Sequence, residues 1–193
     1  MLDLIGIIYF TLSVLYLLGS FPIGVFEFLD LREGYAISDY ATLFETSTYF
    51  SISAIITGLL CGLDSITNPI YKKVSINIYN YHALSSFALL GIGLFPLTGD
   101  GVWSFPRVFH WLFALTFILV YPATRLLILK HYNKRAFEKL LIVFLSLNIL
   151  ALLVTIVVQF KNIAYPEYLM WLSLLLTIVV SKILISRKSK NAE

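Results

Sequence analysis

The residues with the clearest chemical potential in this sequence lie between two apolar stretches. Asp100 stands in the run Pro-Leu-Thr-Gly-Asp-Gly that begins at Pro96, and His110 follows in Phe-His-Trp. An imidazole with one or two carboxylates can bind a divalent metal or transfer a proton. We therefore take His110 and Asp100 as candidate catalytic residues. Together with Asp39 from an earlier acidic segment, they are also candidate metal ligands.

A structural role accounts for the same residues, and we favour it. In this interpretation His110 hydrogen-bonds a loop carbonyl or Asp100 and holds the turn, while the acids are solvated. The catalytic alternative instead needs a carboxylate from the first loop, such as Asp30, Asp39 or Glu45, to fold over His110. These residue types leave the identity of any metal or cofactor unknown.

The remaining histidines and the single cysteine carry weaker signals. At 1.5 Å of rise per residue, His82 and His110 lie at depths that differ by roughly 13 Å, too far apart to share a metal or a haem iron. We expect His82 to meet cytoplasmic water or lipid head groups at a helix end, and Cys61 to be a small core residue. With one cysteine the chain can form neither an internal disulfide nor a Cys-x-x-Cys site. Phosphate-loop, dinucleotide-binding, zinc-protease and serine-hydrolase motifs are also absent from the sequence.

Composition places the chain in a membrane. Hydrophobic residues make up 59% and charged residues 13%, against about 45–50% and 25% in soluble domains. The apolar residues form blocks of about twenty, which match a hydrocarbon layer roughly 30 Å thick. We predict an all-α polytopic transmembrane bundle of six helices that forms a single membrane domain over residues 1–193. The expected spans are residues 4–28, 46–63, 79–95, 108–129, 137–160 and 168–185.

Some features inside the spans predict helix packing. Ala54, Gly58 and Gly62 recur every four residues, which gives the second span a face that another helix backbone can approach closely. Asn148, Gln159 and Lys182 lie within the last two spans and can bond across helices or reach towards water. After the second span, residues 64–80 are expected to form a loop with a turn at Asn68-Pro69.

The distribution of basic residues among the loops predicts how the chain is oriented across the membrane. The first, third and fifth loops hold three of the fourteen Lys and Arg residues, whereas the second and fourth loops and the C-terminal end hold eleven. Because positive loops stay on the cytoplasmic side, we predict a multi-pass protein of the cell membrane with both termini cytoplasmic. The net charge of +3 then reflects inward loops that attract anionic lipid head groups, and no nucleic-acid partner is expected.

The turn that contains the candidate site also resembles a known family. Leu94-Phe95-Pro96 and Gly99-Asp100, followed by Phe109-His110-Trp111 at the start of an apolar helix, are similar to a pattern in small six-helix prokaryotic membrane proteins catalogued as domain of unknown function 998. In that family a Phe-Pro-Thr-Asp-like turn precedes a helix that begins near a histidine. This sequence departs from the pattern at Leu97 and Gly99. The resemblance implies a six-span integral membrane protein and no particular reaction.

Two classes of function follow. The first is a non-catalytic membrane component that binds membrane lipids, a membrane protein partner or a second copy of itself, and we favour it because no nucleophile is arranged beside a base. The alternative is a small membrane enzyme that uses the outer-face His and carboxylate site on a lipid-linked substrate. A transporter is a weaker third class, since Pro22 and Pro122 lie near span ends and not at the membrane midplane.

Overall fold

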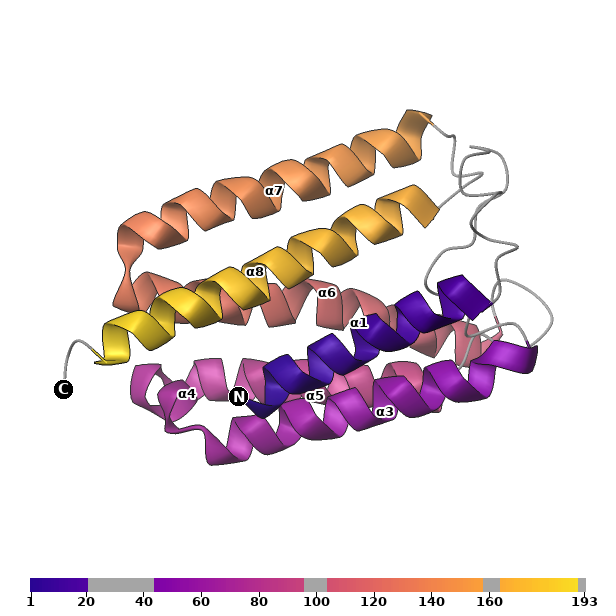
Figure 1. The fold of residues 1–193 in the computed structure, drawn as a ribbon, viewed down its shortest axis with the longest axis horizontal. Helices are drawn as coiled ribbons and strands as arrows, with labels where there is room; N and C mark the ends of the chain where they lie inside the picture. Colours follow the sequence, from indigo (N-terminus) through magenta and orange to yellow (C-terminus); the bar gives the residue numbers. More distant parts are fainter. Residues whose placement is uncertain (21–43, 96–103, 158–163, 191–193) are drawn as a thin grey trace.

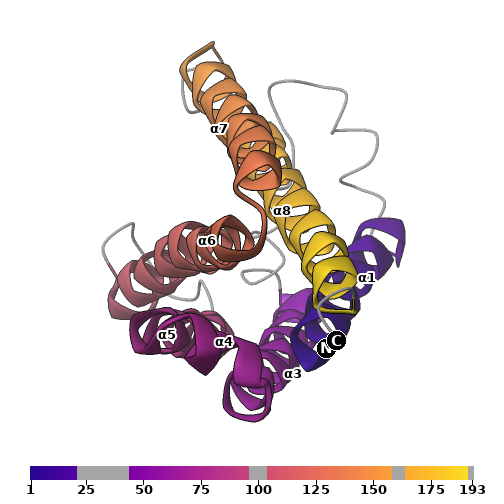
Figure 2. The same cartoon turned by 90° about the vertical axis from the view of Figure 1, so that its left-hand side faces the viewer.

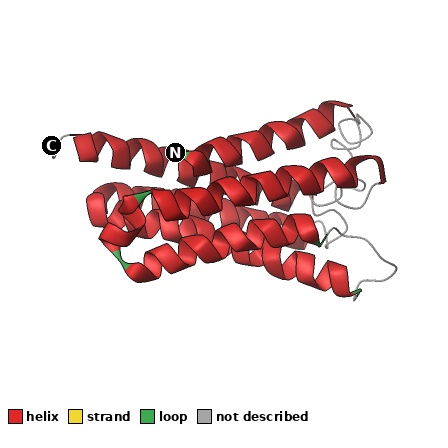
Figure 3. Cartoon of the chain, turned by 90° about the horizontal axis from the view of Figure 1, so that it is seen from below, coloured by secondary structure: helices red, strands yellow, loops and turns green. Residues whose placement is uncertain are grey.

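The computed structural model describes residues 1–20, 44–95, 104–157 and 164–190, and this part of the chain is helical apart from short connections (Figures 1 and 3). The prediction of an all-helical protein is confirmed for these residues. The helices are α1 (Leu2–Ser20), α3 (Phe44–Thr67), α4 (Pro69–Val74), α5 (Ile76–Leu94), α6 (Phe105–Tyr132), α7 (Lys134–Val157) and α8 (Ala164–Lys190).

Four of the described helices are long and apolar enough to cross a membrane: Thr46–Thr67 of α3, α6, α7, and Pro166–Ser186 of α8. The apolar part of α1, Leu2–Leu17, is shorter. The nineteen residues of α5 include two asparagines, a histidine and two serines, and this helix is not among the four candidate spans. The described residues therefore form a helical bundle typical of a membrane protein, with four candidate spans among them, and α1 and α5 pack in the same bundle.

The helices form an open ring when the bundle is viewed from one end (Figure 2). Helix α3 packs against α1 and α5, α5 packs against α6, and α6 contacts both α7 and α8. Helix α7 lies at the edge of the bundle, where most of its apolar side chains are exposed, as expected for a helix that faces lipid acyl chains. The apolar core lies between α1, α3, α5, α6 and α8.

The prediction of a loop over residues 64–80 is wrong, because most of these residues are helical. Helix α3 continues through Asp64 to Thr67, and two single residues, Asn68 and Ser75, separate it from α4 and α5. The Asn68 side chain accepts a hydrogen bond from the backbone N–H of Ile70 at 3.1 Å and caps α4, so the turn signal marks a real break. The charge of Asp64 indicated the end of a span, but this side chain is only 2% exposed and stays inside the bundle.

The small-residue face of α3 lies against α5. A side-chain carbon added to Gly58 would lie 2.8 Å from the backbone nitrogen of Leu90, so the two helices approach closely at this glycine. Ala54 is fully buried on the same face. The two helices are farther apart at Gly62. A side-chain carbon added to Gly62 would lie 4.0 Å from its nearest neighbour, Cβ of Ser86.

Of the two alternatives for the polar residues in the later helices, the structure shows bonds across the bundle for Asn148 and Lys182, whereas Gln159 lies outside the described residues. The Asn148 amide donates to Ser173 Oγ at 2.9 Å between α7 and α8. Lys182 Nζ of α8 lies 2.6 Å from Oδ1 of Asp3 in α1. Cys61 is a buried core residue, as expected.

Candidate functional site

His110, the central residue of the sequence hypothesis, lies near the start of α6 and is 2% exposed. Its Nδ1 atom is 2.8 Å from the carbonyl oxygen of Phe95, the residue that ends α5. This contact ties α6 to the end of α5. Asp100 and Asp39 lie outside the described residues, so the catalytic and metal hypotheses that join them to His110 stay predictions.

The prediction that His82 meets water or lipid head groups is wrong, because its side chain is fully buried. The rings of Tyr71 and Tyr121 lie on either side of the imidazole, with centroids 4.1 and 5.2 Å from its own. Position along the sequence suggested a helix end near water, but α4 precedes α5 and places Tyr71 over the imidazole. No local pattern in residues 69–74 indicates that this short helix folds back onto the bundle.

The hydrogen bonds of His82 indicate its tautomer. Ser65 Oγ donates to the Cys61 carbonyl at 2.9 Å and lies 2.5 Å from Nδ1 of His82. Because the serine hydrogen is already used, Nδ1–H is the donor and Nε2 carries the lone pair. Among the described residues, Nε2 has no hydrogen-bond partner.

A buried charge cluster lies beside His82, made up of Asp3, Asp64, Arg125 and Lys182 with the hydroxyls of Tyr71 and Tyr121. Asp3 is fully buried and forms ion pairs with Arg125 and with Lys182. The Tyr121 hydroxyl donates to Oδ2 of Asp3 at 3.1 Å and accepts from Arg125 Nη2 at 3.3 Å. One carboxylate of α1 therefore joins cations from α6 and α8.

Asp64 extends the cluster to α3 and α4. Its Oδ2 atom accepts the Tyr71 hydroxyl at 2.8 Å, and Oδ1 accepts the backbone N–H of Leu2 at 3.0 Å and pairs with the amino group of Met1. Asp64 thus caps the first turn of α1 from another helix, where a negative charge is favoured by the helix dipole. Burial, the charge of Asp64 and the hydrogen bond to it raise the pKa of Tyr71 above its ordinary value.

Sequence reasoning did not find this cluster. Asp64 falls in the expected loop, Asp3 lies before the first expected span, and Arg125 is one of the eleven basic residues assigned to the cytoplasmic side. The available signal was the occurrence of Arg125 and Lys182 inside long apolar runs, where an ionisable side chain is costly unless it is paired. The carboxylate partners could not be chosen without knowing which helices are neighbours.

A metal ion is one possible occupant of this region, because ligand atoms of Asp3, Asp64 and His82 lie within 4.8 Å of one another. However, both oxygens of Asp3 already contact the cations Arg125 and Lys182. A divalent ion would have to displace these cations and leave them buried without partners, which is costly in a low-dielectric interior. The arrangement therefore fits an ion-pair network better than a metal centre.

A cavity of about 580 Å³ opens beside the charge cluster. Arg125 and Lys182 contribute to its wall, whereas their carboxylate partners do not. Most of the remaining wall is apolar and comes from α1, α4 and α8, with Leu4, Ile70 and Ile183 among its residues. The cavity thus combines an apolar surface with two cationic groups.

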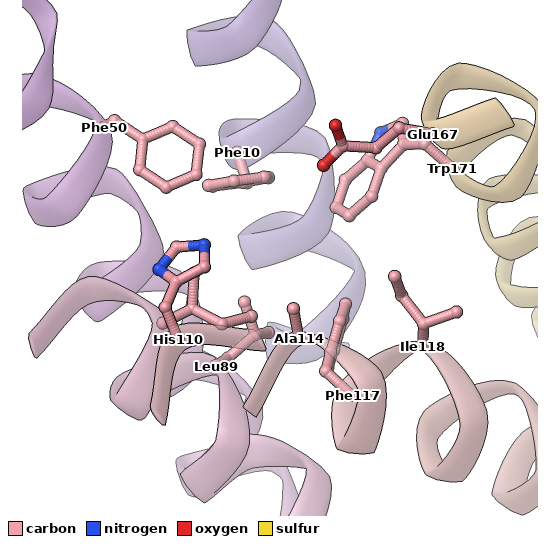
Figure 4. Close-up of a pocket in the computed structure, with 10 residues that line it drawn as sticks. Phe10, Phe50, Leu89, His110, Ala114, Phe117, Ile118, Glu167 and Trp171 are labelled. Carbon is pink, nitrogen blue, oxygen red and sulfur yellow. The ribbon is translucent and has the colours of Figure 1, made fainter. Parts of the chain in front are cut away.

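A second pocket, of about 50 Å³, lies in the half of the bundle that contains His110. Figure 4 shows four aromatic rings around it, together with the His110 imidazole and the Glu167 carboxylate. The rings come from four different helices and belong to Phe10, Phe50, Phe117 and Trp171. We call this site the aromatic pocket.

Comparisons with family models, curated proteins and solved structures found no match to this chain.

Proposed function

We propose that this protein is a non-catalytic component of the membrane that binds a lipid with an anionic head group in the cavity beside Arg125 and Lys182. The observation that carries the proposal is the composition of the cavity wall. Two positively charged side chains, Arg125 and Lys182, line the cavity together with mostly apolar residues. Its volume of about 580 Å³ is within the range of about 300–1,000 Å³ that is common for small-molecule sites.

The two cations have hydrogen-bonding capacity for such a head group. Arg125 has five N–H donors, and its Nε atom has no acceptor among the described residues. Lys182 is 22% exposed and has three N–H donors, of which Asp3 accepts one. Asp3 therefore holds both cations in place without using all their donors, and a phosphate can accept from those that remain.

The surrounding charges favour the same ligand. Lys72 and Lys73 lie in the last turn of α4, and Lys130 lies in the last turn of α6. We further propose six spans with both termini in the cytoplasm, in agreement with the resemblance to domain of unknown function 998. In that orientation the cavity opens towards the cytoplasmic leaflet, where anionic lipids attract basic residues by about 1 kcal/mol each.

Native mass spectrometry of the purified protein with equal amounts of phosphatidylglycerol and phosphatidylcholine tests this function. We expect preferential retention of phosphatidylglycerol, reduced about fivefold by Lys182→Gln, since one basic contact contributes about 1 kcal/mol. Ser186→Phe, at the cavity wall, should remove the preference by filling the space. The matched controls are Lys139→Gln and Ser146→Phe, both at exposed positions away from the cavity.

Equal retention of the two lipids by the wild type would overturn the lipid proposal. A second protein chain retained in place of lipid, and lost with Ser186→Phe, would assign the cavity to a membrane protein partner or a second copy.

The enzyme alternative has one observation in its favour, since His110 and Glu167 line the same pocket. An imidazole and a carboxylate beside a cavity can act in proton transfer on a bound substrate. Under the lipid-binding proposal, His110→Ala and Asp100→Ala should leave the phosphatidylglycerol preference unchanged. Loss of a discrete lipid-linked adduct in both variants, with the phosphatidylglycerol preference intact, would favour the enzyme.

A further inference from the structure

We infer that the lipid bound beside Arg125 and Lys182 extends one acyl chain into an apolar groove between α1 and α8. The inference rests on the proposed function and adds a site for the chain to the site for the head group. The groove has a volume of about 270 Å³, and each of the two helices contributes three residues to its wall. These residues are Ile8, Thr11, Leu12, Leu175, Leu176 and Val179. We call this site the α1–α8 groove.

The α1–α8 groove continues from the cationic cavity along both helices. On α1, Leu4 of the cavity wall is followed on the same helix face, at intervals of four residues, by Ile8 and Leu12 of the groove. On α8, Ile183 of the cavity wall is preceded at the same interval by Val179 of the groove. The groove therefore begins one helical turn from the cavity, and Leu12 lies about 12 Å along the helix from Leu4.

Contacts between α1 and α8 hold the two helices together without filling the groove. Beside the cavity, Lys182 of α8 pairs with Asp3 of α1. Farther along, the rings of Phe10 and Trp171 lie 5.2 Å apart. Phe10 is 3% exposed and Leu12 is 60% exposed, so the ring contact lies on the inner side of α1 and the groove on its outer side.

The wall of the α1–α8 groove suits a hydrocarbon chain better than a polar group. Five of its six residues are aliphatic. The sixth, Thr11, donates its hydroxyl hydrogen to the Ile7 carbonyl of its own helix at 2.7 Å. A polar occupant would leave its hydrogen-bonding groups without partners against such a wall, which is costly. An acyl chain has no such groups and gains dispersion contacts along the groove.

The order of cavity and groove matches the order of the parts of a lipid in one bilayer leaflet. In the proposed orientation the cations lie at the cytoplasmic end, and the groove runs from them towards the middle of the membrane. A phospholipid likewise places its charged group at the interface and its chains in the hydrocarbon layer. One lipid molecule can therefore occupy both sites, whereas a soluble phosphate ester would occupy the cavity alone.

Two substitutions block the groove without changing the cations. They are Thr11→Phe and Leu12→Trp, and each has a matched control on α7, at a position outside the walls of the groove and the cavity. Thr155, like Thr11, donates to the carbonyl four residues earlier in its helix, here at 2.8 Å. Leu152 is 58% exposed, close to the 60% of Leu12. The controls are therefore Thr155→Phe and Leu152→Trp.

Native mass spectrometry of the full chain in detergent tests the inference with three probes at equal concentration. The probes are phosphatidylglycerol, its single-chain lysolipid, and glycerophosphoglycerol, which is the free head group. Because the groove takes one chain, we expect the wild type to retain the two lipids equally and the free head group roughly tenfold less. Thr11→Phe and Leu12→Trp should lower retention of both lipids about tenfold and leave the preference for phosphatidylglycerol over phosphatidylcholine unchanged. Both controls should match the wild type.

The outcomes separate failure of the chain site from failure of the head-group site. Unchanged lipid retention by the two blocked variants, shown to be folded by thermal unfolding in the same detergent, would overturn the inference while the phosphatidylglycerol preference stands. Equal retention of the free head group and the lysolipid by the wild type would also overturn it, and would assign the cavity to a soluble phosphate ester. That comparison needs no variant. Absence of a phosphatidylglycerol preference in the wild type would overturn the proposed function and the inference with it.

Discussion

Lys182 Nζ and Asp3 Oδ1 lie 2.6 Å apart although 179 residues separate them in the chain. This contact joins the last helix to the first, and Arg125 of α6 pairs with the other oxygen of the same carboxylate. A single acidic side chain therefore connects three helices.

Asp3→Asn should lower the free energy of unfolding by about 3–5 kcal/mol, because it leaves the buried Arg125 and the partly buried Lys182 without their carboxylate. Denaturation by SDS in mixed micelles, followed by circular dichroism, measures the change. Glu138→Gln, which neutralises an exposed acid on α7, is the control and should have little effect. Equal stability of Asp3→Asn and the wild type would show that the network does not stabilise the fold.

Tyr71→Phe should destabilise the protein by about 2 kcal/mol at neutral pH, since it removes a buried hydrogen bond to a carboxylate. The raised pKa of Tyr71 also predicts a pH effect. Above about pH 10 the unfolded chain loses this proton while the folded chain keeps it, so stability falls as pH rises, by up to about 1.4 kcal/mol per pH unit.

Stability curves of wild type and Tyr71→Phe from pH 8 to 11.5 test that sign. The difference between the two proteins should shrink above pH 10, because the variant lacks the tyrosine proton. A difference that stays constant, or widens, over this range would contradict the assignment of Tyr71 as a buried neutral donor.

Gly58→Ala should be destabilising by about 1–3 kcal/mol, because the new methyl group would lie 2.8 Å from the Leu90 backbone nitrogen and the helices would have to separate. Gly62→Ala is the matched change one turn away, where the nearest atom is 4.0 Å distant. It should be neutral or stabilising by up to about 1 kcal/mol through helix propensity. Thermal unfolding in detergent compares them, and equal effects of the two substitutions would contradict the packing described for α3 and α5.

Cysteine labelling tests the proposed orientation. Cys61 is buried and should react slowly, so single cysteines introduced at the exposed positions Phe105 and Lys134 can be followed. A membrane-impermeant maleimide applied to intact cells should label Phe105→Cys, whereas Lys134→Cys should react only after lysis. Labelling in the reverse pattern would place the charge cluster and its cavity at the outer leaflet.

The helical class and the small-residue face of α3 could be predicted from the sequence because they depend on local composition and spacing. Hydropathy predicts membrane helices, and polar residues inside apolar runs, such as Asn148 and Lys182, indicate either bonds across the bundle or contact with water. Asp64 shows where this reasoning fails: a charge at the end of an apolar run fits a loop and a buried ion pair equally well. Only the position of α1 beside α3 distinguishes them.

The functional sites required information that local patterns do not contain. The aromatic pocket collects one ring from each of four helices, and none of these residues has a distinctive spacing in the sequence. The sequence places His82 near a helix end and therefore near water. In the structure the ring of Tyr71, from the short helix α4, packs against the imidazole and contributes to its burial. The hypothesis that joins His110 to Asp100 and Asp39 stays a prediction.

The most direct test of the lipid-binding proposal is photocrosslinking with diazirine-labelled phosphatidylglycerol in nanodiscs, followed by peptide mapping. The proposal predicts crosslinks concentrated in α8 around Ile183 and in α4 around Ile70, suppressed by excess unlabelled phosphatidylglycerol but not by phosphatidylcholine. Crosslinks spread evenly over the exposed helix faces, or suppressed equally by both lipids, would contradict it.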